Sequence, residues 1–202
     1  VKGEIEFDHV SFAYPEAGEN VLTDISFKAK KGQTIAVIGS TGSGKSTLIN
    51  LIPRYYDVTK GSVKVDGVDV RDMTQKELRD KLGYVPQKGV LFSGTIDSNI
   101  RYGKPEITDA QVKEAAEVAQ ATEFIDTKPE KYESPVSQGG TNVSGGQKQR
   151  LSIARAIAKD PEIFIFDDSF SALDFKTDSQ LRKALKEYTK DATTVIVAQR
   201  IS

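Results

Sequence analysis

The residues with the clearest chemical potential lie in one glycine-rich run. Residues 39–46 read Gly-Ser-Thr-Gly-Ser-Gly-Lys-Ser, which fits the pattern G-x-x-x-x-G-K-[S/T]. Glycines let the backbone curl so that successive N–H groups face an anion, and a following helix adds its positive N-terminal end. Lys45 offers a cation for the β- and γ-phosphates, and Ser46 offers a hydroxyl oxygen for magnesium. The run predicts a binding loop for a nucleoside triphosphate; the alternative is a plain glycine-rich turn.

A magnesium ion at this loop also needs a carboxylate. The apolar run 163–166 delivers Asp167 and Asp168 at its carboxyl end, and ligand sites of parallel α/β sheets lie at such ends. Asp167 is the predicted magnesium partner, through water; the alternative is an acidic loop after a core strand. The nucleotide is expected to contact the loop at Ser40, Thr41, Gly42, Ser43, Gly44, Lys45, Ser46 and Thr47.

The elements around this loop are predicted to be strands of an α/β domain. Residues 34–38 form a short apolar run suited to a central strand buried on both faces, with a helix from about Lys45. Residues 4–14 alternate like a half-buried strand, and a one-residue change of register there indicates a bulge. Further strands are expected at 21–30, 83–87, 162–166 and 193–198, and Asp66-Gly67 within 62–70 indicates a hairpin turn.

Three capping boxes predict helix starts, at 74–77, 108–111 and 144–147. Their helices are expected to end near Leu82, before a loop at 127–143, and at Ala158, and another helix is expected over 174–188. The chain is thus predicted to be one domain over 1–202, truncated at its C-terminus. Within it, residues 1–94 and 159–202 would form a β subdomain and core, and residues 95–158 a helical subdomain.

Composition narrows the class of protein. The 202 residues suffice for one sizeable domain or two packed subdomains, with 38% hydrophobic and 28% charged residues. A net charge of −1 weighs against nucleic acid as a partner, and the absence of cysteine excludes disulfides and thiolate chemistry. Apolar runs are far too short to cross a bilayer, and no signal-peptide pattern opens the chain. The isolated domain is expected to be soluble.

A further motif is more specific than the glycine-rich loop. Residues 143–150 read Val-Ser-Gly-Gly-Gln-Lys-Gln-Arg, which resembles the signature sequence of ABC-type ATPases. The loop resembles their Walker A, residues 164–167 their Walker B and residues 171–174 their D-loop, and the likeness runs from about Glu4 to Ser202. It implies a phosphate-loop NTPase (RecA-like) core with an antiparallel β subdomain and an inserted helical signature subdomain, and ATP and Mg²⁺ as cofactors.

The resemblance also implies roles for residues outside the loop. Tyr14 resembles the aromatic residue that stacks on adenine, with a packed strand residue as the alternative. Gln87 stands where the Q-loop glutamine binds magnesium, with a solvated loop residue as the alternative. The signature grips the ATP of a partner subunit, here through Ser144, Gly145, Gly146 and Gln147, although Ser144 could also simply cap its own helix. The implied partner is a second nucleotide-binding domain.

Two segments resemble exporter-type members of the family. Residues 91–96 with Asn99-Ile100 look like the segment after their Q-loop, and residues 134–140 resemble their X-loop, which touches coupling helices of membrane domains. Gln138 departs from the X-loop pattern, where glutamate is usual. The implied partners are transmembrane domains of an exporter, met through the Q-loop and X-loop regions. The implied location is the cytoplasmic face of the cell membrane.

Two departures concern hydrolysis. Family members that hydrolyse ATP well carry glutamate directly after the Walker B aspartate; Asp168 is shorter, so its carboxylate would fall short of the attacking water by roughly one bond length. Gln199 replaces the switch histidine, and the one histidine, His9, is expected to be structural or at the surface. The implied catalytic set is therefore Lys45, Gln87, Asp168 and Gln199, with weak hydrolysis. The hypothesis is the degenerate-site subunit of a heterodimeric multidrug-type exporter.

Three alternatives stay open. The first is a catalytically competent homodimeric exporter, in which aspartate suffices as the base. The second is a soluble ABC ATPase acting on nucleic acid or ribosomes, which the X-loop and the neutral charge disfavour. The third is a phosphate-loop kinase outside the family, which the signature disfavours. Substrate specificity is expected to reside in membrane segments, so this sequence does not name a transported substrate.

Overall fold

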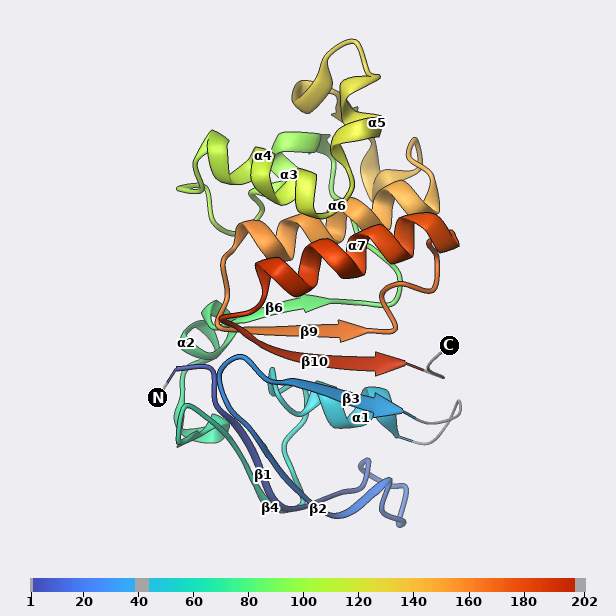
Figure 1. The fold of residues 1–202 in the computed structure, drawn as a ribbon. Helices are drawn as coiled ribbons and strands as arrows, with labels where there is room; N and C mark the ends of the chain where they lie inside the picture. Colours follow the sequence, from blue (N-terminus) through green and yellow to red (C-terminus); the bar gives the residue numbers. More distant parts are fainter. Residues whose placement is uncertain (1, 39–43, 199–202) are drawn as a thin grey trace. The chain divides into compact units, whose positions relative to one another are not determined.

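The computed structural model describes residues 2–38 and 44–198 of the chain. The chain folds as two compact units (Figure 1). The first comprises the residues up to 83, residues 161–168 and the segment from 190 onward; the second comprises 84–160 and 169–189. The subdomain boundaries predicted at 94/95 and 158/159 stay a prediction.

An antiparallel sheet occupies the start of the first unit. Its strand order is β2-β1-β4-β5, with β1 (Ile5–Phe12), β2 (Leu22–Ala29), β4 (Lys60–Val65) and β5 (Val68–Asp69). The predicted bulge is confirmed, because the register of β1 shifts against both neighbours between Phe7 and Ser11. His9, inside the bulge, has a φ of 49°, and a Cβ on Gly61 would come within 2.3 Å of its carbonyl oxygen. Only glycine fits at position 61.

The predicted hairpin joins β4 to β5. Asp66 and Gly67 both have positive φ values, 54° and 80°, which a two-residue turn of this kind requires. The Asp66 carboxylate accepts a hydrogen bond from the Glu4 amide at 3.1 Å and forms an ion pair with the Lys81 ammonium at 2.9 Å. The turn is therefore anchored to the residue before β1 and to the residue that follows α2 (Gln75–Asp80).

A parallel sheet supplies the strand ends on which the site depends. Its order is β3-β10-β9-β6, with β3 (Thr34–Ile38), β10 (Thr193–Ala198), β9 (Ile163–Asp167) and β6 (Leu82–Val85). Strand β10 pairs in parallel with both β3 and β9, so the carboxyl ends of all three lie together (Figure 1). The four apolar residues of β9 are buried. The predicted α/β class is confirmed.

One prediction about this sheet is wrong. Strand β3 was expected to be central and buried on both faces, but it lies at an edge of the sheet and none of its residues is buried. Ile38 at its end is 51% exposed. Apolar composition predicts a strand but carries no information on strand order. Within 2–38 and 44–198, β3 pairs with β10 alone.

Helices make up about half of the second unit. They are α3 (Ile96–Ile100), α4 (Asp109–Val118), α5 (Thr122–Asp126), α6 (Gly145–Ala158) and α7 (Phe175–Tyr188). Helix α6 contacts α3 and α4, and α4 also contacts α7 (Figure 1). The predicted caps at Thr74, Thr108 and Ser144 all accept hydrogen bonds from the expected backbone amides. Thr108 and Ser144 form the full predicted capping boxes, whereas the Glu77 carboxylate accepts from the Thr74 hydroxyl. A further capping box at Thr95 was not predicted.

The region from 127 to 143 is mostly irregular, as predicted. It contains two 3₁₀ turns, η2 (Lys131–Glu133) and η3 (Gln138–Gly140), and a two-residue strand, β8 (Pro135–Val136). Strand β8 pairs with β7 (Gly94–Thr95), directly before α3. A third 3₁₀ turn, η1 (Val70–Asp72), and helix α1 (Lys45–Asn50) belong to the first unit. Within 2–38 and 44–198, no helix has both the length and the apolar character needed to cross a membrane.

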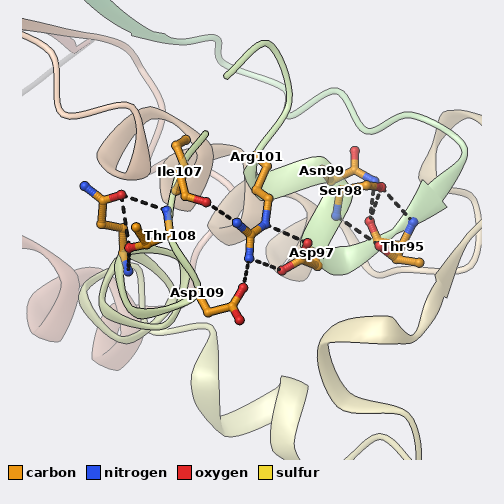
Figure 2. A network of polar contacts seen from close by, with 9 residues as sticks. Thr95, Asp97, Ser98, Asn99, Arg101, Ile107, Thr108 and Asp109 are labelled. Carbon is orange, nitrogen blue, oxygen red and sulfur yellow. Dashed lines mark hydrogen bonds and ion pairs between the residues drawn. The ribbon is translucent and has the colours of Figure 1, made fainter. Parts of the chain in front are cut away.

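Arg101, just past the end of α3, ties that helix to the start of α4. Its guanidinium donates two hydrogen bonds to the Asp97 carboxylate, at 2.8 and 3.1 Å. It also reaches the carbonyl of Ile107 and the carboxylate of Asp109, the first residue of α4 (Figure 2). The guanidinium is half-enclosed, with its side chain 19% exposed. One planar cation therefore orders the whole turn between the two helices.

We predict that Arg101→Lys lowers the free energy of unfolding by about 1–2 kcal/mol, measured by urea denaturation, because an ammonium cannot reproduce the guanidinium fork toward two carboxylates and a carbonyl. The matched control is Arg182→Lys, since Arg182 pairs with Asp178 on the same helix and is 52% exposed. The control is expected to change stability by less than about 0.5 kcal/mol. Equal losses in the two variants would contradict this role of Arg101.

Candidate functional site

The glycine-rich loop connects the end of β3 to the start of α1. Residues 39–43, which include the predicted contacts Ser40, Thr41, Gly42 and Ser43, lie outside the described residues. Gly44 precedes α1 with a φ of 87°, in the left-handed region. A Cβ on Gly44 would lie 3.1 Å from the Val21 side chain, so both conformation and space favour glycine here. Helix α1 contacts β9 and β10, which places its first residues at the strand ends.

Lys45 and Ser46 meet the ends of two strands. The Ser46 hydroxyl donates to the Asp167 carboxylate at 3.3 Å, and the Lys45 ammonium donates to the carbonyl of Ala198 at 3.3 Å. A hydroxyl oxygen and a carboxylate oxygen side by side are the donor set that Mg²⁺ accepts. The described residues contain no cluster of three His, Cys, Asp or Glu side chains able to hold a metal. The two oxygens of Ser46 and Asp167 suit a magnesium ion that takes its remaining ligands from water and a phosphate.

Asp168 occupies an unusual backbone conformation. Its φ is 49°, which is uncommon for a residue other than glycine, and its amide donates to the Val197 carbonyl at 2.8 Å. Burial raises the pKa of the Asp168 carboxyl, Lys45 opposes this, and the neighbouring charge of Asp167 adds to it. The carboxyl is thus held beside Lys45 on a strained segment, as candidate catalytic groups often are. Gln199, one residue past β10, lies outside the described residues.

Tyr14 lies beside the first turn of α1. Its hydroxyl and the Thr47 hydroxyl are 2.7 Å apart and share a hydrogen bond. Its ring contacts Phe12 edge-on at 4.9 Å and Tyr56 edge-on at 5.3 Å, measured between ring centroids. Tyr14 is therefore joined to the phosphate-loop helix, two residues beyond the end of β1. Tyr56 was not predicted, and no pattern in the sequence singles it out.

The remaining predicted residues belong to the second unit. Gln87 is exposed, two residues beyond β6, and its role toward magnesium stays a prediction. Ser144 is exposed at the start of α6, and its hydroxyl accepts from the Gln147 amide at 3.1 Å, so it does cap its helix. Gly145 has open space where a Cβ would stand, and nothing lies closer than 3.7 Å to that position on Gly146. The action of these four residues on a partner's ATP stays a prediction.

Two further polar residues have local roles. His9 is at the surface, as expected: its side chain is 75% exposed, and a hydrogen bond to Asp24 raises its pKa. Asp174, in the predicted D-loop, caps α7 by accepting from the amide and the hydroxyl of Thr177, at 2.8 and 3.0 Å. The amide and hydroxyl hydrogen bonds of Thr177 lower the pKa of Asp174.

The chain matches a family model and is similar to known proteins. The sequence model of the ABC transporter family matches residues 22–171. The chain is 47% identical over 202 residues to "Putative multidrug export ATP-binding/permease protein YgaD" of Bacillus subtilis (strain 168), covering 100% of this chain and 35% of that protein. It is also 47% identical over 201 residues to a Staphylococcus aureus (strain NCTC 8325 / PS 47) protein of the same descriptive name, with the same coverage of 100% and 35%.

A solved structure shows the same fold. The chain matches the structure described as "Structure of a bacterial Atm1-family ABC exporter with ATP bound" with a TM-score of 0.92 and 38% sequence identity. The match covers 98% of this chain and 35% of that one. The chain thus spans about a third of the length of the relatives that it matches.

The raised pKa of Asp168 predicts a specific pH dependence of stability. The folded chain binds this proton more tightly than the unfolded chain, so the contribution of Asp168 to the free energy of unfolding falls as pH rises through its folded pKa. We expect Asp168→Asn to gain stability relative to the unaltered chain as pH is raised from about 4 to about 7 in urea denaturation.

Asp174→Asn is the matched control, for which the change in relative stability with pH is expected to have the opposite sign. Because the pKa of Asp174 is lowered, its contribution is present above the unfolded pKa and is lost as pH falls through the folded pKa. This variant is expected to lose stability relative to the unaltered chain over the same rise in pH. An Asp168→Asn chain that also loses stability as pH rises would mean that attraction to Lys45 outweighs burial.

Proposed function

This chain belongs to the ABC transporter family, and we propose that it is the ATP-binding, ATP-hydrolysing domain of an exporter. The observation that carries the proposal is the meeting of Ser46 and Asp167 at 3.3 Å beside Lys45. In this family fold, the two sequence motifs that bind phosphate and magnesium supply these residues. Exporter names among the relatives, which include an ATP-binding and a permease part, support the assignment to an exporter.

Different residues would bind the phosphates, the magnesium ion and the adenine of the nucleotide. Lys45 neutralises charge on the β- and γ-phosphates, and the N–H groups at the start of α1 face them. Ser46 and Asp167 would hold magnesium, which supplies charge neutralisation at the transferred phosphate when bound. The Tyr14 ring would stack on adenine, with its hydroxyl held at Thr47 and its ring supported by Tyr56.

The signature would act on a second nucleotide-binding domain. Gly145 leaves open space at the start of α6, so a phosphate carried by a partner can approach the helix end. Ser144, Gly145, Gly146 and Gln147 supply hydroxyl, amide and side-chain groups there. In this arrangement the signature of one subunit completes the ATP site of the other, and binding of ATP closes the dimer.

Hydrolysis at this chain's own loop is proposed to be slow. A general base must lie within hydrogen-bond reach of the attacking water, and Asp168 is one methylene shorter than glutamate. Its backbone is anchored through the Val197 carbonyl, which limits any shift that would compensate for the shorter side chain. Gln199 can donate and accept hydrogen bonds but cannot carry the charge of a histidine. These two residues favour a degenerate site within a heterodimer, completed by a more active site on the partner.

The second unit carries an exposed aromatic surface on which the permease part of such a protein would dock. Phe92 and Tyr102 are exposed (40% and 57%) and stack on each other with centroids 4.3 Å apart. Arg155 lies against both rings and donates to the carbonyls of Val90 and Asn99, at 2.8 and 2.9 Å. The Asn99 amide in turn holds the Phe92 backbone through two hydrogen bonds of 2.8 Å. We infer that this rigid aromatic patch, after the Q-loop, receives a membrane-domain segment.

The test of the proposed function is ATP binding and hydrolysis by this chain, alone and with Asp168→Glu plus Gln199→His. The unaltered chain is expected to bind MgATP with slow turnover. The double change is expected to raise kcat by at least about tenfold with little change in ATP affinity, because the base then reaches the water and the histidine is restored.

Ser179→Ala, an exposed serine on α7, is the matched control and is expected to leave both binding and rate unchanged. Fast hydrolysis by the unaltered chain, at a rate that the double change does not raise, would contradict the degenerate-site proposal and favour a competent homodimer. Absence of ATP binding would overturn the function as a whole.

A further inference from the structure

Gln149 is a buried polar residue of α6 that lies within the signature run. Its side chain is 0% exposed. The side-chain nitrogen, Nε2, donates to the carbonyl of Pro86 at 3.0 Å and to the carbonyl of Ser169 at 2.8 Å. A glutamine amide has two N–H donors, and two carbonyls from different segments receive them. One side chain therefore joins α6 to the residue before Gln87 and to the residue after Asp168.

Ser169 completes a closed arrangement. It is also 0% exposed, and its hydroxyl donates to the carbonyl of Val85 at 2.6 Å. Val85 ends β6 and is bonded to Pro86, so three hydrogen bonds link three segments in a ring. We name this set of residues, Val85, Pro86, Gln149 and Ser169, the Gln149 triangle. All four belong to the second unit.

The backbone of the Gln87 loop packs directly on α6 beside this triangle. A Cβ on Gly89 would stand 2.8 Å from the Lys148 carbonyl oxygen and 3.2 Å from the Gln149 Cα. These are backbone atoms of a helix and cannot move aside cheaply. The loop that carries Gln87 is thus fixed to α6 by the hydrogen bond from Gln149 to Pro86 and by the close backbone contact at Gly89.

The side-chain oxygen of Gln149, Oε1, helps to explain why glutamine occupies this position. Its Oε1 is buried and has no hydrogen-bond partner among the described residues. A buried polar atom without a partner is unfavourable, and an apolar side chain of the same length would avoid it. The amide therefore serves through its donors, which means through the two carbonyls that it holds.

We propose that Gln149 is a positioning residue for ATP hydrolysis, which keeps the Gln87 loop, the segment after Asp168 and the signature end of α6 in one mutual arrangement. The proposal rests on the function proposed above. Each corner of the triangle lies near a predicted site residue in the sequence: Pro86 precedes Gln87, Ser169 follows Asp168, and Gln149 lies five residues beyond Ser144. A shift of any one segment is passed to the other two through these hydrogen bonds, because packed interiors adopt discrete arrangements.

The test uses a reporter on the loop itself. The chain contains no cysteine, and Lys88 is exposed next to Gln87, so Lys88→Cys provides a single thiol for an environment-sensitive fluorophore. In the labelled chain, MgATP is expected to change the emission. Adding Gln149→Met, which keeps the length but removes both donors, is expected to reduce that emission change at least about fivefold and to lower kcat about tenfold, with ATP affinity within about twofold.

Ser152→Ala is the matched control, since Ser152 is a buried polar residue on the same helix, and it is expected to leave all three quantities unchanged. Should Gln149→Met fail to fold, Gln149→Asn keeps both donors on a shorter stem and is expected to give an intermediate emission change at unaltered ATP affinity. The proposal is overturned if either variant keeps the full emission change and rate. It is also overturned if the MgATP-induced emission change, kcat, ATP affinity and melting temperature all fall together, because a merely structural role of Gln149 would give that result. Failure of the labelled, otherwise unaltered chain to bind MgATP would instead reject the proposed function.

Discussion

The hydrogen bond between Ser46 and Asp167 marks the constraint on which the site depends. Ser46 is the second residue of α1 and Asp167 ends β9, and 121 positions separate them in the sequence. They meet because β10 pairs in parallel with both β3 and β9, which places the exits of all three strands at one edge of the sheet. Once that pairing exists, the helix after β3 must start beside the carboxylates after β9.

The second unit is organised on a different principle. Side chains at the ends of its helices order the connections between them: Thr95, Thr108 and Ser144 by capping boxes, and Arg101 by its guanidinium. Buried polar groups then fix the segments that carry candidate site residues, as Gln149 and Ser169 do around Pro86. In the first unit backbone pairing positions the chemistry, whereas in the second unit side-chain hydrogen bonds do so.

Much of the fold was predictable from the sequence because its signals are local. The Asp66-Gly67 turn, the three predicted caps and the bulge in β1 all depend on residues close in the chain, and the structure confirms each of them. The place of β3 at a sheet edge was not predictable, because strand order depends on partners far away in sequence. At the site, motif spacing pointed to Lys45, Ser46 and Asp167. The contacts of Tyr14 with Thr47 and Tyr56, and the triangle around Gln149, arise from tertiary packing that no spacing encodes.

In the proposed site, a magnesium-bound triphosphate lies at the start of α1 and the end of β9. Amide hydrogen exchange with and without MgATP tests it most directly, because it reports on both segments at once. We expect slower exchange in peptides covering residues 44–50 and 163–168 when MgATP is present, and a smaller effect when a chelator removes magnesium. Exchange in both segments that is unchanged at saturating MgATP would contradict it.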